Sequence, residues 1–539
     1  MPATSVESGF ATALDMARSA CRRRQDAPLV HYFGTALTGG EVDAASDALA
    51  AALAARGVGQ GDRVALYLQN VPQLPIGLIA AWKLGAIAVP VNPMLRECEL
   101  AHVLADSGAT AIISLEQLHE DVTRHALAGS AVRTAISSSP LDYLDAPPSM
   151  LSDIGRRPQA DAEDFRALVA AHAGQRPPDV RVEPDDVATL VYTSGTTGPP
   201  KGAMNLHRNI AFASTVWRDW PGLRDDDVNL GLAPLFHITG LIAGLGVSLA
   251  AAAPLVLGYR FDPAATLELI ARHRPTFTVA AITAYQALMR APGFDAADFG
   301  SLRAAYTGGA PVAPAVAEAW RSATGVRLHN AYGLTESTSP LTLTPLGAEG
   351  RVDPASGALS VGVPVYDSRV EILGDDGAAL PPGEIGEIVA TGPQVVPGYW
   401  RKPDETAIAL PDGRLRTGDV GYVDGDGWVY LVDRRKDLII ASGFKVWPRE
   451  VEDVLYTHPA VREAAVVGVA DAYRGETVKA YVSLKAGAEV TVEELVAHCK
   501  QRMAAYKYPR EVEVVDELPK SPTGKILRRS LRARAATEA

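Results

Sequence analysis

The 539-residue sequence is short of cysteine and of positive charge, and each shortage excludes a class of protein. Its three cysteines, Cys21, Cys98 and Cys499, fit neither a disulfide framework nor a four-ligand zinc site, so a reducing compartment is expected. With 51 basic and 63 acidic residues the net charge is -12, which argues against a nucleic-acid binder. The N-terminus lacks a basic region followed by an apolar run, so no secretory signal is expected and the predicted location is the cytoplasm.

One uncharged segment, residues 238–259, is long enough to cross a bilayer. It is rich in glycine and alanine and has Pro254 near its end, a pattern that predicts a buried helix, a turn and a buried strand. No transmembrane segment is therefore expected. Hydrophobic residues make up 47% and charged residues 21%, as in folded globular proteins, and the length favours two or more domains.

Short apolar strands alternate with helical stretches between residues 63 and 114, and a second such series runs from about 187 to 328. This alternation predicts βαβ units around buried parallel sheets. Residues 137–179 read as a surface connection with a short helix. From residue 357 the pattern changes to short strands between turn signals, and a compact tail of helices and strands begins near residue 433.

The strongest local signal is the loop Thr193-Ser-Gly-Thr-Thr-Gly-Pro-Pro-Lys201-Gly, which follows an apolar strand at residues 187–192. Glycines let backbone N–H groups turn inward, hydroxyls add donors and the lysine adds charge, so the loop suits a polyphosphate. It is not a Walker A loop, because Lys201 follows two prolines and precedes a glycine.

Six further motifs follow in order along the chain. They are Pro234-Leu-Phe-His237, Tyr306-Thr-Gly308-Gly309-Ala310, Asn330-Ala-Tyr332-Gly-Leu-Thr335-Glu336, Arg416-Thr-Gly-Asp419, Asp433-Arg434-Arg-Lys436, and Pro519-Lys520-Ser-Pro-Thr-Gly524-Lys525. Singly, each has an ordinary explanation as a turn, a core histidine, a helix start, a charged linker or a basic tail. As a series with the loop, they resemble the adenylate-forming superfamily of acyl-CoA synthetases, luciferases and adenylation domains, and most closely bacterial long-chain fatty-acid–CoA ligases.

The resemblance implies an α/β fold with two domains. Residues 1–435 would form an N-terminal AMP-binding domain, made of two doubly wound α/β subdomains and a small β-barrel-like subdomain. Residues 436–539 would form a small, mobile α+β domain that carries the catalytic lysine. The implied reaction joins a carboxylic acid to ATP, releases pyrophosphate, and then transfers the acyl group to coenzyme A, with Mg²⁺ on the phosphates.

The resemblance also assigns roles to residues. The catalytic residues would be Lys525, Thr335 and His237. ATP and AMP would be bound by Thr193, Ser194, Gly195, Thr196, Thr197, Gly198, Lys201, Gly309, Ala310, Asn330, Ala331, Tyr332, Gly333, Thr335, Asp419, Arg434 and Lys525. The acyl group would contact His237, Leu241, Gly308 and Gly309; CoA would contact Ser442, Gly443 and Lys445; Glu336 would hold the metal and Lys436 would be the hinge.

The identity of the acid is predicted from residues near His237. No aspartate follows Phe236-His237, where amino-acid-activating relatives need one, so an uncharged acyl body is favoured, as in a medium- to long-chain fatty acid. Leu241 stands where some long-chain members place a tryptophan. An aryl- or cinnamate-type CoA ligase, a fatty acyl-AMP ligase that loads a carrier protein, and a non-catalytic adenylate-binding protein stay open, as does a homodimer.

Overall fold

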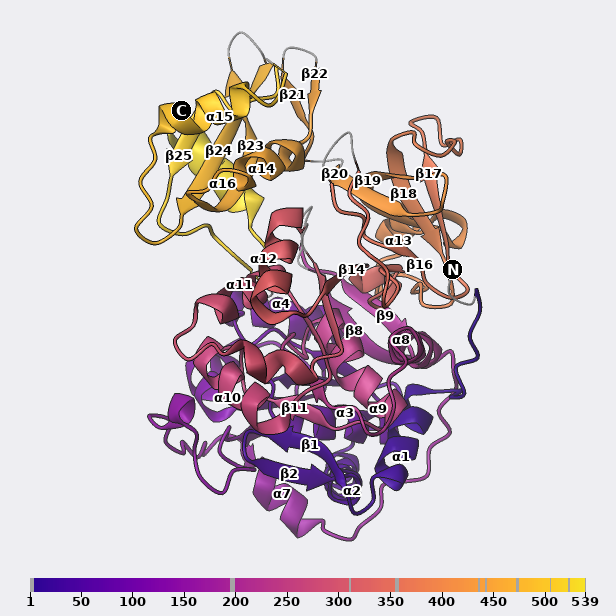
Figure 1. Ribbon diagram of the computed structural model, residues 1–539. Coiled ribbons are helices and arrows are strands. Elements are labelled where there is room, and N and C mark those ends of the chain that lie inside the picture. The colour runs from indigo at the N-terminus through magenta and orange to yellow at the C-terminus, as the bar shows by residue number, and fades with distance from the viewer. Residues whose placement is uncertain are drawn as a thin grey trace.

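The computed structural model describes residues 4–193, 199–309, 312–353, 358–434, 437–441, 444–471, 475–504, 506–521 and 524–538. Two large sheets and their helices form the body of the molecule, and two smaller sheets follow in the last third of the chain (Figure 1). The predicted α/β class is confirmed.

The first large sheet has seven strands in the order β7-β6-β5-β3-β4-β8-β9. All neighbours are parallel except β8 and β9, which form an antiparallel pair around the glycine-rich loop. The strands are β3 (Arg63–Tyr67), β4 (Ile87–Pro90), β5 (Ala111–Leu115), β6 (Thr134–Ser138), β7 (Glu163–Asp164), β8 (Val187–Tyr192) and β9 (Gly202–Leu206).

The second large sheet has nine strands in the order β16-β15-β14-β13-β12-β10-β11-β1-β2. Strands β1, β11, β10, β12, β13 and β14 run parallel, so their carboxyl ends share one edge. The strands are β1 (Pro28–Tyr32), β2 (Thr35–Thr38), β10 (Asn229–Leu230), β11 (Leu255–Leu257), β12 (Phe277–Ala280), β13 (Ala304–Gly308), β14 (Leu328–Tyr332), β15 (Thr342–Leu343) and β16 (Val363–Pro364).

The membership of the two sheets corrects the predicted division at residue 187. Strands β8 and β9 belong with the first series, whereas β1 and β2, near the N-terminus, pair beside β11 in the second. Sequence order did not show this because each sheet recruits an edge from a distant part of the chain, through contacts that leave no local pattern.

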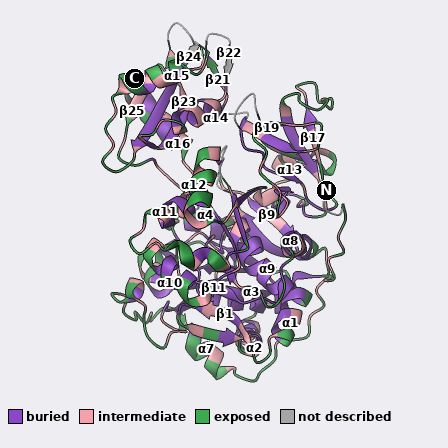
Figure 2. Ribbon diagram, in the orientation of Figure 1, coloured by how far each residue is buried: buried purple, intermediate pink, exposed green. Residues whose placement is uncertain are grey.

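One continuous core joins both sheets (Figure 2). Its central helix, α3 (Gln73–Lys83), is buried at every position, because it packs between other elements rather than facing water. It contacts α1 (Ala13–Arg23) and α2 (Gly39–Ala55). The other helices of the body include α4 (Glu97–Ser107), α7 (Phe165–Ala171), α8 (His207–Asp219), α10 (Pro263–His273), α11 (Ile282–Arg290) and α12 (Pro314–Thr324).

The uncharged segment forms a buried π-helical turn, Gly240–Gly246, then α9 (Val247–Ala251) and strand β11. This is the predicted helix, turn and strand. In the part of the chain that the structure describes, no helix is long and apolar enough to cross a membrane.

Two antiparallel-rich units complete the chain. The first is the sheet β17 (Arg369–Leu373), β18 (Gly386–Thr391), β19 (Leu415–Val423) and β20 (Val429–Arg434), beside helix α13 (Pro403–Ala409). The second, here called the C-terminal unit, has its own core. It contains β21 (Ile439–Ala441), β22 (Phe444–Val446), β23 (Val461–Asp471), β24 (Gly475–Leu484), β25 (Glu511–Val514), α14 (Pro448–Tyr456), α15 (Val492–Lys500) and α16 (Arg528–Glu538).

Buried His207 makes stability depend on pH. His207 is 1% exposed, its ring lies 5.7 Å from that of Trp82, and burial lowers its pKa from 6.5 to about 4. Above pH 6.5 the His207 side chain is neutral in both the folded and the unfolded protein. Between pH 6.5 and 4 it gains a proton only in the unfolded protein. As the pH falls from 6.5 to 4, the free energy of unfolding of the wild type should therefore fall by up to roughly 3 kcal/mol relative to that of His207→Gln. Urea unfolding followed by tryptophan fluorescence measures this difference. A difference that stays constant with pH would contradict this.

Candidate active site

The predicted site residues gather at the carboxyl edge of the nine-stranded sheet. His237 follows β10, Ala281 follows β12, Gly308 ends β13 and Tyr332 ends β14, and these four strands are adjacent and parallel. In open α/β sheets this edge is where ligands bind. Motifs that are about 100 residues apart in sequence thus lie on neighbouring strands.

The stem of the glycine-rich loop is closed by two hydrogen bonds. The Thr193 amide donates to the Lys201 carbonyl at 2.9 Å, and the Lys201 amide donates to Thr193 Oγ1 at 3.4 Å. Both residues sit where β8 and β9 part, at the loop end of the hairpin. The stem therefore places Lys201 at the base of the predicted phosphate loop.

Tyr399 links Lys201 to Glu336. The ammonium of Lys201 lies 4.5 Å from the centre of the Tyr399 ring, and the Tyr399 hydroxyl donates to Glu336 Oε1 at 2.6 Å. Burial and the Glu336 charge raise the Tyr399 pKa, so the phenol keeps the proton that it donates. Tyr399 was not predicted from the sequence. No local pattern marks it, because Tyr399 reaches this place through the pairing of its backbone with Ala203, which only the fold shows.

A second polar pair joins β14 to the four-stranded sheet. The Tyr332 hydroxyl donates to Asp419 Oδ2 at 2.8 Å, and both side chains are buried. Asp419 is the register partner of Arg434 in β20, so the two residues predicted to bind ribose and phosphate are neighbours. Asn330 is also buried and donates from its side-chain amide to the Ser360 carbonyl at 3.2 Å.

Glycines keep the ends of β13 and β14 close together. A Cβ on Gly308 would lie 2.8 Å from the carbonyl oxygen of Ala331, its register partner, and a Cβ on Gly333 would clash with the Ser339 carbonyl. Gly309 has a φ of +79°, a backbone conformation that residues with a side chain rarely adopt. Backbone groups are thus exposed to a ligand at this edge without a side chain in between.

His237 lies between the apolar π-helical turn and the sheet edge. The Thr239 amide donates to its Nδ1 at 3.3 Å, and its own carbonyl accepts from the Leu241 amide at 2.9 Å. Burial, and then the positive charge of Lys525, lower its pKa to about 4. His237 is therefore neutral at physiological pH.

The Lys525 segment docks on the body of the molecule. At Gly524 a Cβ would clash with Thr283 Oγ1 and lie 3.4 Å from the Ala281 Cβ, so the segment touches the chain just after β12. The Lys525 amide donates to Ser521 Oγ at 3.1 Å. The C-terminal unit thus delivers Lys525 to the same edge as His237 and Gly308.

Several predicted residues lie outside the described part of the chain. These are Ser194, Gly195, Thr196, Thr197, Gly198, Ala310, Lys436, Ser442 and Gly443, together with the side chains of Arg434 and Lys445. Thr335 and Glu336 open a short 3₁₀ turn directly after β14, and Leu241 is 2% exposed within the core.

The residues present fit a magnesium ion. No cluster of three or more His, Cys, Asp or Glu side chains suited to a metal occurs among the described residues. Mg²⁺ does not need one, because it usually takes one or two carboxylates and completes its shell with substrate phosphates and water. Glu336, beside Lys201 and Tyr399, provides such a carboxylate.

Comparison with known proteins shows the family to which the chain belongs. The AMP-binding enzyme family matches residues 17–400, and the AMP-binding enzyme C-terminal domain matches residues 450–525. A long-chain-fatty-acid–CoA ligase of Bacillus subtilis (strain 168) is 37% identical over 521 residues, 94% of this chain and 92% of that protein. A feruloyl-CoA synthase of Amycolatopsis sp is 37% identical over 513 residues, 95% and 97% of the two chains.

Solved structures of CoA ligases resemble this chain over nearly its whole length. A crystal structure of an anthranilate CoA ligase with anthranoyl-AMP superposes with a TM-score of 0.88 at 28% identity, covering 99% of both chains. A benzoate CoA ligase from Burkholderia xenovorans LB400 gives 0.85 at 27% identity, covering 97% of this chain and 100% of that one.

The fold and these relatives together define an adenylate-forming enzyme. The chain belongs to the AMP-binding enzyme family. Within it, the protein is an acyl-CoA synthetase, an acid–CoA ligase, and the predicted superfamily is confirmed.

Tyr399→Phe tests the link between Lys201 and Glu336. The variant keeps the ring beside Lys201 and removes the hydrogen bond to Glu336. A hydrogen bond to a charged group contributes about 1.5–3 kcal/mol, so kcat/KM for pyrophosphate release should fall about 10- to 100-fold, with a raised Mg²⁺ requirement. Tyr430→Phe is the matched control, because Tyr430 donates to Asp424 at 3.3 Å in the four-stranded sheet. Identical Mg²⁺ dependence in Tyr399→Phe and wild type would contradict the role.

Proposed function

We propose that this acyl-CoA synthetase activates an uncharged carboxylic acid, with a medium- to long-chain fatty acid as its substrate. In the first half-reaction a carboxylate oxygen attacks the α-phosphorus of ATP, the α–β anhydride bond breaks, and pyrophosphate leaves. In the second, the CoA thiol loses its proton, its sulfur attacks the acyl carbon, and AMP leaves. The overall products are acyl-CoA, AMP and pyrophosphate.

The observation that carries the choice of acid is the apolar surroundings of His237. No charged side chain occurs between residues 238 and 257, and the π-helical turn Gly240–Gly246 is buried throughout. His237 itself is neutral. An α-ammonium group or a second carboxylate on the substrate would be buried here without a counter-charge, which is costly. An alkyl chain has no such cost.

The charged residues are assigned to ATP and to the reacting carboxylate of the acid. We assign Lys201 and the loop around it to the phosphates, Asp419 and Arg434 to the ribose, and Lys525 to the reacting carboxylate and α-phosphate. Tyr332 and Thr335, at the end of β14, would contact the nucleotide. Positive charge from two distant segments offsets the repulsion between the two anions.

Magnesium would be held by Glu336, where it neutralises charge on the triphosphate. For the second half-reaction we assign CoA to Ser442, Gly443 and Lys445. Residues 436–539 would act as the mobile domain on residues 1–435, turning about Lys436 so that the thiol reaches the place that Lys525 occupies during the first.

An aryl acid is the second candidate, because an aromatic layer lies below Gly308. Tyr306, two residues earlier on the same face of β13, packs edge-on to Trp217 at 5.3 Å and lies 5.1 Å from the His329 ring. Trp217 also donates from Nε1 to Ser339 Oγ at 3.2 Å, which fixes its position. This layer would obstruct a straight chain along the sheet and would favour a short, flat acid.

A panel of acids distinguishes the two candidates. Pyrophosphate release is measured with Mg-ATP and octanoic, palmitic, benzoic, ferulic and malonic acids and leucine, each with and without CoA. We expect the highest kcat/KM for a fatty acid, at least about tenfold above malonate and leucine, since a buried unpaired charge costs more than about 1.4 kcal/mol. Faster turnover of benzoate or ferulate would favour the aryl candidate. Preference for malonate or leucine, or no dependence on CoA, would overturn the proposal.

A further inference from the structure

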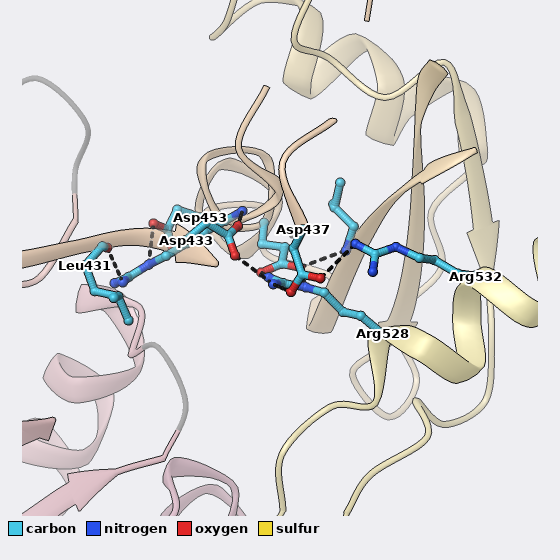
Figure 3. Close-up of polar contacts among 9 residues, drawn as sticks. Leu431, Asp433, Asp437, Asp453, Arg528 and Arg532 are labelled. Carbon is cyan, nitrogen blue, oxygen red and sulfur yellow. Dashed lines mark hydrogen bonds and ion pairs between the residues drawn. The ribbon is translucent and has the colours of Figure 1, made fainter. Parts of the chain in front are cut away.

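A largely buried arginine connects the C-terminal unit to the sheet before it (Figure 3). Arg528 opens α16, three residues after Lys525. Its Nη1 donates to Asp433 Oδ1 at 2.9 Å and to Asp437 Oδ2 at 3.2 Å, and its Nη2 donates to Glu452 Oε2 at 2.7 Å. The Arg528 side chain is 17% exposed, and the three carboxylates are between 3% and 11% exposed.

The partners of Arg528 come from two different units. Asp433 lies in β20 of the four-stranded sheet, whereas Glu452 lies in α14 of the C-terminal unit. Asp433 is held from a second side as well, because its Oδ2 accepts from the Arg449 amide at 2.9 Å. Arg449 in turn donates from Nη1 to the Leu431 carbonyl at 2.7 Å. Helices α14 and α16 are thus both tied to β20.

The same segment carries Lys525. The Ser521 amide donates to the Lys525 carbonyl at 2.7 Å and the Leu527 amide donates to the Pro519 carbonyl at 2.8 Å, so the segment folds back on itself just before Arg528. Its tip at Gly524 packs against Thr283. Lys525 is therefore held between that contact and the anchor that Arg528 makes with Asp433.

We propose that Arg528, paired with Asp433, is a positioning residue that holds Lys525 at the acyl site during adenylate formation. The inference rests on the proposed function. In the second half-reaction the C-terminal unit turns relative to β20, which separates Arg528 from Asp433, while Glu452 and Asp437 move with Arg528. The Arg528–Asp433 pair is thus a contact of the first half-reaction.

A neighbouring pair offers a matched control. Arg532, one turn further along α16, donates from Nη2 to Asp437 Oδ1 at 2.8 Å (Figure 3). Asp437 follows the proposed hinge, so this pair belongs to the C-terminal unit. A substitution at Arg532 disturbs the same charged cluster without changing the contact with β20.

The test measures the two half-reactions separately in Asp433→Asn. Asparagine keeps an oxygen for the Arg449 amide but loses the charge that pairs with Arg528. Acid-dependent exchange of labelled pyrophosphate into ATP should fall about tenfold or more, whereas thioester formation from supplied acyl-adenylate and CoA should stay within about twofold. Arg532→Lys should keep both rates within about twofold of wild type. Equal losses in both half-reactions of Asp433→Asn, or the same selective loss in Arg532→Lys, would overturn the proposal.

Amide hydrogen exchange of the full-length enzyme without substrate gives an answer that does not depend on the acid. Peptides covering residues 519–527 and 281–284 should exchange faster in Asp433→Asn than in wild type and Arg532→Lys. Unchanged exchange in Asp433→Asn would overturn the positioning role. If wild type released no pyrophosphate with any acid, the proposed function would fail, and the exchange result would still decide whether Arg528 holds the segment.

Discussion

Burying the guanidinium of Arg528 is the constraint on which the arrangement of the C-terminal unit depends. An arginine away from water must be surrounded by carboxylates, and losing one partner of a buried pair costs about 3–5 kcal/mol. Burial by itself would lower the Arg528 pKa, but Glu452 and Asp433 more than offset this and raise it. Because one of these carboxylates belongs to β20, Arg528 is fully paired in the orientation that presents Lys525 to the body of the molecule.

A second constraint is the mutual repulsion of the two substrates. A carboxylate and a triphosphate approach each other only where positive charge is concentrated, and the charge must come from fixed positions to avoid the cost of ordering it. Lys201 is fixed by a hairpin of the seven-stranded sheet, and Lys525 comes from the C-terminal unit. The parallel strands β10, β12, β13 and β14 supply the surface between them.

Much of the local structure could be predicted from the sequence. The strand predicted before the glycine-rich loop is β8, and the helices and strands expected in the tail after residue 433 are those of the C-terminal unit, because apolar periodicity and turn residues act locally. Gly308 and Tyr332 end the strands β13 and β14, whereas Asp419 lies within β19. The partnership of β1 with β11 could not be predicted, since it joins residues more than 200 positions apart and neither strand carries a signal for the other.

The residues that the sequence did not identify share one property: their roles depend on a partner that is distant in the chain. Tyr399 has a role because the segment that contains it pairs with β9, which brings its hydroxyl to Glu336. Asp433 was visible as part of a charged motif, and Arg528 as part of a basic tail, but only the fold shows that they neutralise each other.

The same contrast explains why the reaction is easier to infer than the acid. At Gly308 and Gly333 a side chain would clash with neighbouring backbone, so these motif positions favour glycine and leave a clear sequence signal. By contrast, Trp217 and Tyr306 below Gly308 are packed core side chains, which many sequences could replace with others of similar volume. The glycine-containing motifs are thus recognisable in the sequence, whereas a preference among acids, under the proposed function, would depend on how the core below Gly308 is filled.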